Sequence, residues 1–86
     1  MTYALNTLEK ASAYVTELIQ ELEDMIALFP NAMNGENTEM ADNLRQGHET
    51  HKNLFDTAHQ SILNGEDEED HGYAILLAES VLNSKD

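Results

Sequence analysis

The chain has 86 residues, enough for one domain with a thin core, and it has no cysteine, which excludes disulfides and thiolate metal sites. Seventeen Asp and Glu against four Lys and Arg give a formal net charge of −13, which argues against direct binding to nucleic acid or an anionic membrane and favours a partner with a basic surface. Because we find neither a signal peptide pattern nor an apolar run near the ~20 residues that span a bilayer, we expect a cytoplasmic protein.

The first predicted helix covers residues 3–29. Apolar and small residues recur in it at alternating gaps of four and three, which is the pattern of a heptad seam. The seam consists of Ala4, Leu8, Ala11, Val15, Leu18, Leu22, Met25 and Phe29. We expect Pro30 to end this helix, because proline clashes with the preceding turn, and Asn34-Gly35 to form the tight turn that follows.

The second predicted helix covers residues 37–63, with Asn37 or Thr38 as its cap. Its predicted inward line contains glycine, serine and histidine and is weaker than the first. The line consists of Met40, Leu44, Gly47, His51, Leu54, Ala58 and Ser61, flanked by His48, Phe55 and Ile62. Gly47 is expected to mark a close helix approach or a mild kink. The short turn between two long helices predicts an antiparallel hairpin.

The third predicted helix covers residues 68–83, after a helix end at Asn64-Gly65. Its centre, residues 73–78, is apolar on nearly every side, which is typical of a helix buried on more than one face. We therefore predict an all-α fold in a single domain, residues 1–86. This fold is a three-helix bundle built on the long antiparallel hairpin and completed by oligomerisation, as a homodimer that covers the third helix.

Two patterns in the sequence resemble metal sites but lack required ligands, so no metal or cofactor is expected. His48 and His51 lie one turn apart, but a stable site needs more ligands, and the Glu-x-x-His pairs of di-iron bundles do not occur. The two histidines fit the edge of a helix interface or a pH-sensitive contact, and the sequence does not decide their role. An EF-hand aligned on Asp67 has Gly72 at its sixth position but Ala78 at the twelfth, where a glutamate is required.

Nothing in the sequence indicates catalysis. We find no nucleophile with an adjacent base and no glycine-rich phosphate loop. Rows of carboxylates on a helix face are usually solvated surface rather than acid–base catalysts. We therefore do not expect an enzyme.

Acidic residues recur in rows on the polar faces of the predicted helices. The candidate partner-binding residues are Glu17, Glu21 and Asp24 in the first helix, Glu39, Asp42, Glu49 and Asp56 in the second, and Glu66, Asp67, Glu68, Glu69 and Asp70 before the third. Carboxylates that repeat about every 5 Å along a helix could enter a site built for phosphates. The alternative is a solvated surface that only confers solubility.

These patterns lead to two hypotheses about function. The first is an inhibitor: an acidic decoy that imitates nucleic acid and covers the basic site of a nucleic-acid-binding protein. In size and charge alone, the chain is similar to small proteins of phages and mobile elements that block restriction, CRISPR or nucleoid proteins. The alternative is a helical-hairpin co-chaperone or subunit that pairs with a partner helix through its apolar seam.

Overall fold

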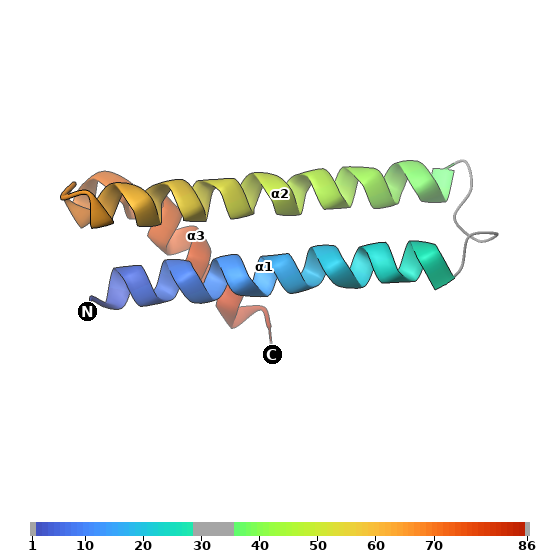
Figure 1. The fold of residues 1–86 in the computed structure, drawn as a ribbon, viewed down its shortest axis with the longest axis horizontal. Helices are drawn as coiled ribbons and strands as arrows, with labels where there is room; N and C mark the ends of the chain where they lie inside the picture. Colours follow the sequence, from blue (N-terminus) through green and yellow to red (C-terminus); the bar gives the residue numbers. More distant parts are fainter. Residues whose placement is uncertain (1, 29–35, 86) are drawn as a thin grey trace.

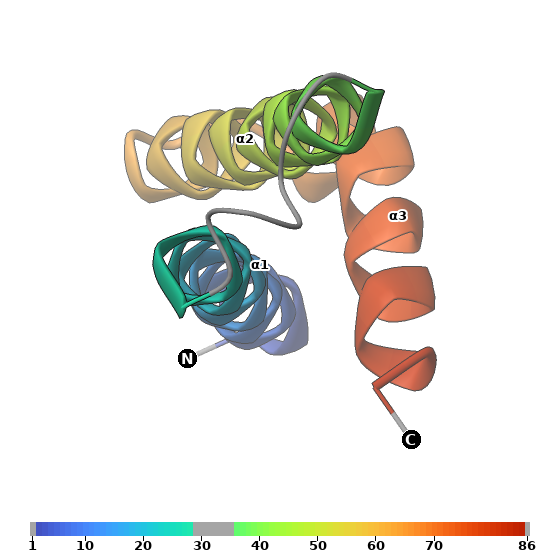
Figure 2. The ribbon, with the colours of Figure 1, turned by 90° about the vertical axis from the view of Figure 1, so that its right-hand side faces the viewer.

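The computed structural model describes residues 2–28 and 36–85, and the side chains of the second range from residue 39 onward. Three α-helices and one 3-10 turn form this part of the chain: α1 (Tyr3–Leu28), α2 (Glu36–Leu63), η1 (Glu68–His71) and α3 (Gly72–Asn83). No strand occurs among the described residues, so the predicted all-helical class is confirmed. Helices α1 and α2 lie side by side in opposite directions, and α3 crosses one face of this pair near one end (Figures 1 and 2).

The predicted helix ends are close to those observed. At the start of α1, the hydroxyl of Thr2 accepts a hydrogen bond from the backbone N–H of Leu5 at 3.2 Å, which satisfies a donor of the first turn. Helix α2 begins at Glu36, so Asn37 and Thr38 lie inside its first turn, and the prediction that one of them caps it is wrong by a residue or two. The predictions for Phe29, Pro30 and the turn at residues 34–35 concern positions outside the described residues.

The end of α2 has the hydrogen bonds of a Schellman motif. Gly65 has a φ of 105° and donates its N–H to the carbonyl of Ile62 at 3.0 Å, while Glu66 donates to Ser61 at 3.1 Å. Glycine adopts this left-handed conformation without the clash that a Cβ atom causes. The prediction that Asn64-Gly65 closes the helix is confirmed.

The core lies where all three helices meet. Leu8, Val15 and Phe55 are its largest fully buried side chains. From α3, Ala74 and Ala78 reach the same cluster, and their small side chains allow close helix packing. Most of the predicted seam of α1 is buried, but Leu18 is half-buried and Met25 is exposed.

The predicted inward line of α2 is only partly correct. Met40 and Leu44 are 68% and 53% exposed, while Ala41 and Phe55 are buried. The predicted line is correct at Ala58, which is buried, but near the start of the helix the buried side lies about one residue later, at Ala41 rather than Met40. Gly47 is exposed, and no atom of another helix lies within 4 Å of where its Cβ would be, so the predicted close helix approach at this residue is wrong.

Helix α3 buries much of its apolar surface within the chain. Partly buried aliphatic side chains on several of its sides pack against the core cluster: Ile75, Leu77, Val81 and Leu82. Tyr73 and Leu76 remain exposed on its outer side. A second chain is therefore not needed to explain why α3 is apolar on nearly every side. Among the described residues, no helix is long and apolar enough to cross a membrane.

The register of α2 can be tested by two truncations on that helix. Phe55→Ala should lower the free energy of unfolding by about 3–5 kcal/mol, because it empties the centre of the core. Leu44→Ala should cost less than about 1 kcal/mol, because half of that side chain is already in water. Urea denaturation measures both. Similar losses for the two variants would contradict the observed register.

Candidate protein-binding surface

Helix α3 covers only one half of the α1–α2 pair. It has 12 residues, a length of about 18 Å, whereas α1 and α2 have 26 and 28 residues and extend about 40 Å. On α1, the hydroxyl of Tyr3 donates to Glu79 of α3 at 2.5 Å, and the ring of Tyr14 lies 5.5 Å from the ammonium of Lys85, just after the end of α3. We call residues 17–28 of α1 and 36–50 of α2, which lie toward the other end of the pair, the distal segment (Figure 1).

A shallow groove of about 170 Å³ lies between the two helices of the distal segment. Its walls are mainly apolar and come from both helices: Leu18, Glu21, Leu22 and Met25 of α1, and Leu44 and His48 of α2. Met25 is 46% exposed and Leu44 is 53% exposed. Farther toward the end of the segment, Leu28 and Met40 are exposed as well. The groove therefore belongs to a larger apolar surface that no described residue covers.

This groove continues the face on which α3 packs. The α1 side chains beside α3 are spaced by four, three and four residues: Tyr3, Thr7, Lys10 and Tyr14. The same spacing continues without interruption into the distal segment: Leu18, Glu21, Met25 and Leu28. Residues at this spacing lie along one side of a helix. Helix α3 thus occupies the first half of a continuous surface and leaves the second half open.

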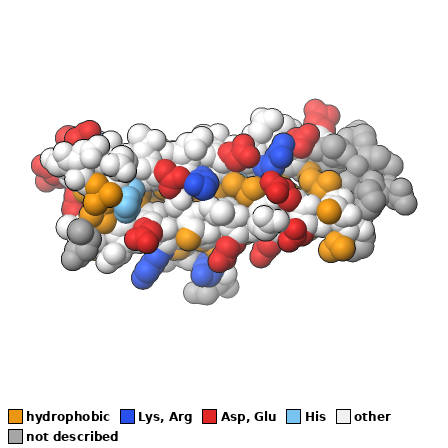
Figure 3. Space-filling model, viewed as in Figure 1, with side chains coloured by type: hydrophobic (Ala, Val, Ile, Leu, Met, Phe, Trp, Pro, Cys, Tyr) orange, Lys and Arg blue, Asp and Glu red, His pale blue; other side chains and the backbone are white. Residues whose placement is uncertain are grey.

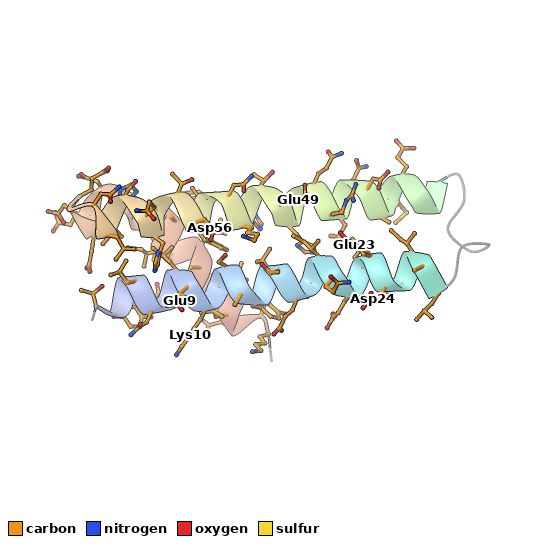
Figure 4. All side chains as sticks on the ribbon, viewed as in Figure 1. Glu9, Lys10, Glu23, Asp24, Glu49 and Asp56 are labelled. Carbon is orange, nitrogen blue, oxygen red and sulfur yellow. The ribbon has the colours of Figure 1, made fainter. Side chains whose placement is uncertain are left out.

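The structure places half of the predicted partner-binding acids in the distal segment. These are Glu17, Glu21 and Asp24 of α1, and Glu39, Asp42 and Glu49 of α2. By sequence, the segment carries eight carboxylates and one arginine, a formal net charge of −7. Figure 3 shows acidic side chains along both helices on the face away from α3, and Figure 4 labels Glu23, Asp24 and Glu49 in this half of the molecule.

Two acids of the α2 row are engaged by neighbouring side chains. Asp42 lies 3.6 Å from the guanidinium of Arg45. Asp56 lies toward α1 and accepts hydrogen bonds from the hydroxyl of Ser12 at 2.5 Å and from the ammonium of Lys52 at 2.7 Å. Glu39 and Glu49 are exposed and form no ion pair with any described residue. The predicted partner-binding acids of α2 therefore differ in their contacts, although their spacing in the sequence predicts a uniform row.

The surroundings of Asp56 shift the pKa of its carboxyl group. Partial burial acts to raise this pKa, but the hydrogen bonds from Lys52 and Ser12 and the charges of Lys52 and His59 together outweigh burial, so the pKa lies below its ordinary value. The folded state thus favours the carboxylate form. Asp56 contributes to the contact between α1 and α2 as well as to surface charge.

The acidic run at residues 66–70 lies at the other end of the molecule, between α2 and α3 (Figure 1). The carboxylate of Asp67 accepts the backbone N–H of Glu69 at 3.0 Å and caps η1. Glu66 lies 3.0 Å from the ring nitrogen Nε2 of His71. The structure therefore separates this run from the acids of the distal segment, and two of its residues have local structural contacts.

The two histidines considered as ligands have different surroundings. His48 lines the groove, and the ring of His51 lies 6.3 Å from that of Phe55 in a tilted arrangement. Among the described residues, no group of three or more histidine, cysteine or acidic side chains could hold a metal ion.

The groove is not predicted by the sequence pattern. Leu18, Met25, Met40 and Leu44 have the spacing of a seam, which predicts core residues at these positions. The difference in length between the third helix and the first two was the available signal, since a helix of 12 residues cannot cover both partners along their length.

Asp56→Asn should test the pKa shift at this contact. Because the folded state lowers the pKa, the charged carboxylate stabilises the fold above the ordinary pKa of about 3.9, and this contribution is lost as the pH falls through the lowered value. The stability advantage of the original chain over the variant should be small at neutral pH, below about 1 kcal/mol because the side chain is half exposed, and should disappear in acid.

Urea denaturation between roughly pH 7 and pH 2 measures this difference. Glu49→Gln is the control, because it removes an exposed charge from the same helix at a position without an ion pair in the described structure. An advantage over Asp56→Asn that stays constant with pH would show that the carboxylate form is not favoured by folding.

Comparison with known proteins gives no match: the chain matches no protein-family model, no curated protein and no solved structure.

Proposed function

We propose that the protein acts by binding rather than by catalysis, and that it inhibits a nucleic-acid-binding protein by covering its basic surface. The observation that supports this most directly is the charge of the distal segment. Its formal net charge is −7, and most of its carboxylates are exposed. A surface of this charge attracts a basic surface and repels nucleic acid and anionic membranes.

The arrangement of these acids favours collective recognition. In α1, Glu17, Glu21 and Asp24 form one row at gaps of four and three residues. Glu39 and Glu49 lie on α2, which runs antiparallel to α1, so acidic side chains occur on both helices of the segment. A single exposed ion pair contributes only ~0–1 kcal/mol, but several charges on a rigid scaffold add up and speed association.

The second candidate function is pairing with a partner helix, as a co-chaperone or subunit does. The observation that favours it is the apolar groove of the distal segment, which no described residue covers. The two candidates differ in their dependence on salt. Screening weakens recognition by carboxylates, whereas burial of apolar surface persists at high salt.

We also propose that α1 and α2 form the hairpin on which a three-helix bundle is built. Two such bundles form a homodimer through the outer side of α3. Tyr73 and Leu76 are exposed there, one turn apart. Residues 72–83 carry a single charged side chain, Glu79, which is bound to Tyr3. Two copies can therefore meet at this side with little repulsion. The cytoplasmic location remains a prediction from composition.

Neutralising four exposed acids of the distal segment together should abolish most partner binding. The variant is Glu17→Gln, Glu21→Gln, Glu39→Gln and Glu49→Gln, and it should keep its fold, because these side chains are exposed and their loss reduces repulsion. Affinity capture from the native host, with the original chain and the variant as baits, compares what each retains. Nucleic acid added as competitor should release the partner.

The matched control changes the net charge by the same amount elsewhere: Glu9→Gln, Glu68→Gln, Glu69→Gln and Asp70→Asn. It should retain the partner. Raising the salt from ~0.1 M to ~1 M, which shortens the Debye length from ~10 Å to ~3 Å, should release it. Retention by the distal variant, or binding that is unchanged by salt and by nucleic acid, would contradict the decoy and favour apolar pairing.

The homodimer is tested by light scattering over a range of micromolar concentrations. The original chain should give the mass of a dimer of two 86-residue chains, and the variant Tyr73→Gln with Leu76→Gln should give the mass of the monomer. A monomer mass for the original chain at every concentration would remove the dimer from the proposal.

A further inference from the structure

We propose that the distal groove receives a basic amphipathic helix of the partner, whose apolar side lies between α1 and α2 and whose Lys and Arg side chains reach the acids at the rim. This inference rests on the proposed function and deepens it, because it assigns the site of contact and the secondary structure of the bound element. Three features of the groove support it.

The first feature is continuity with a surface that already holds a helix. In the same chain, α3 packs across the α1–α2 pair and inserts Ala74 and Ala78 into the core. The α1 stripe that contacts α3 runs on, at the same spacing, into the groove. A segment packed beside α3 therefore contacts a similar surface formed by two helices. A helix of about three or four turns would match the length of α1 that α3 leaves uncovered.

The second feature is the charge around the groove. Glu21 lines it directly, and Glu17 and Asp24 follow on the neighbouring row of α1. Apolar walls with acids on the rim suit a helix whose apolar stripe is flanked by lysine or arginine. The α3 helix of a second copy fits this rim poorly, because residues 72–83 contain no lysine or arginine.

The third feature is the type of apolar side chain at the open end. Met25, Met40, Leu28 and Leu44 are exposed there. Methionine is unbranched and polarisable and adapts to different apolar surfaces, which suits binding of a helix rather than packing of a fixed core. The two methionines therefore make this apolar surface adaptable beside the charged rim.

The experiment uses the full-length chain and a labelled synthetic peptide of roughly four helical turns. Leucines at spacing i, i+4, i+7 and i+11 form its apolar stripe, and lysine and arginine occupy the flanks. One control peptide keeps the stripe and replaces each lysine and arginine by glutamate. A second control has the same composition as the probe in an order that breaks the stripe. Fluorescence anisotropy measures the affinity, and we expect binding of the basic amphipathic peptide alone.

The decisive variant is Met25→Gln with Leu44→Gln, which makes the groove polar and leaves every charge in place. It should weaken binding of the basic peptide at least about tenfold. Leu63→Gln is the control, because it replaces an exposed apolar side chain at the end of α2, outside the groove, and should leave the affinity unchanged. Circular dichroism and urea denaturation confirm that each variant remains folded, as the exposure of the three side chains leads us to expect.

The possible results separate this inference from the proposed function. Equal affinity for the original chain and the groove variant, with loss of binding in the four-acid variant, would overturn the groove and leave recognition by charge intact. Equal binding of the acidic-flank peptide would overturn both. Self-association of the original chain that Met25→Gln with Leu44→Gln abolishes would make a second copy the occupant and overturn the inference. Chemical-shift changes in the labelled chain, confined to groove residues, would support it.

Discussion

Packing around Phe55 is the interaction on which the arrangement of the three helices depends. This ring is fully buried beside Leu8 and Val15 of α1, and Ala74 and Ala78 of α3 belong to the same cluster. Alanine at both α3 positions brings the third helix close to the pair, where longer side chains would hold it away. Because this cluster lies toward one end of α1 and α2, α3 is fixed at that end. The open distal segment is a direct consequence of where the core lies.

The core and the net charge act in opposite directions. A chain of 86 residues buries a limited apolar surface, while a net charge of −13 gives repulsion that opposes folding. The structure reduces this conflict by local contacts at some acids: Asp56 binds Ser12 and Lys52, and Asp67 caps η1. Exposed acids such as Glu17 and Glu49 have no such contact among the described residues. A partner with a basic surface would relieve their repulsion, which is the physical reason to expect binding there.

Periodicity and turn chemistry predicted the helices well, because both are local properties of the sequence. The seam of α1 and the helix end at Gly65 follow from the spacing of apolar residues and from glycine's access to positive φ. The register of α2 did not follow, because Met40 and Leu44 have the spacing of core residues and only the position of α3 decides whether they are covered. The candidate site was therefore half predicted: the acids are visible in the sequence, but the groove between them is a property of how the helices assemble.

An open apolar groove favours self-association of a small protein, because two copies can bury their grooves against each other. The acidic rim opposes this pairing, since two grooves that approach each other bring Glu17, Glu21 and Asp24 of one copy toward the same acids of the other. The same rim attracts an apolar helix flanked by lysine and arginine. One set of charges thus disfavours the second copy and favours the basic partner, and specificity of this kind arises from repulsion as much as from attraction. The apolar residues supply contact area, and the carboxylates make binding selective for a helix that carries lysine and arginine.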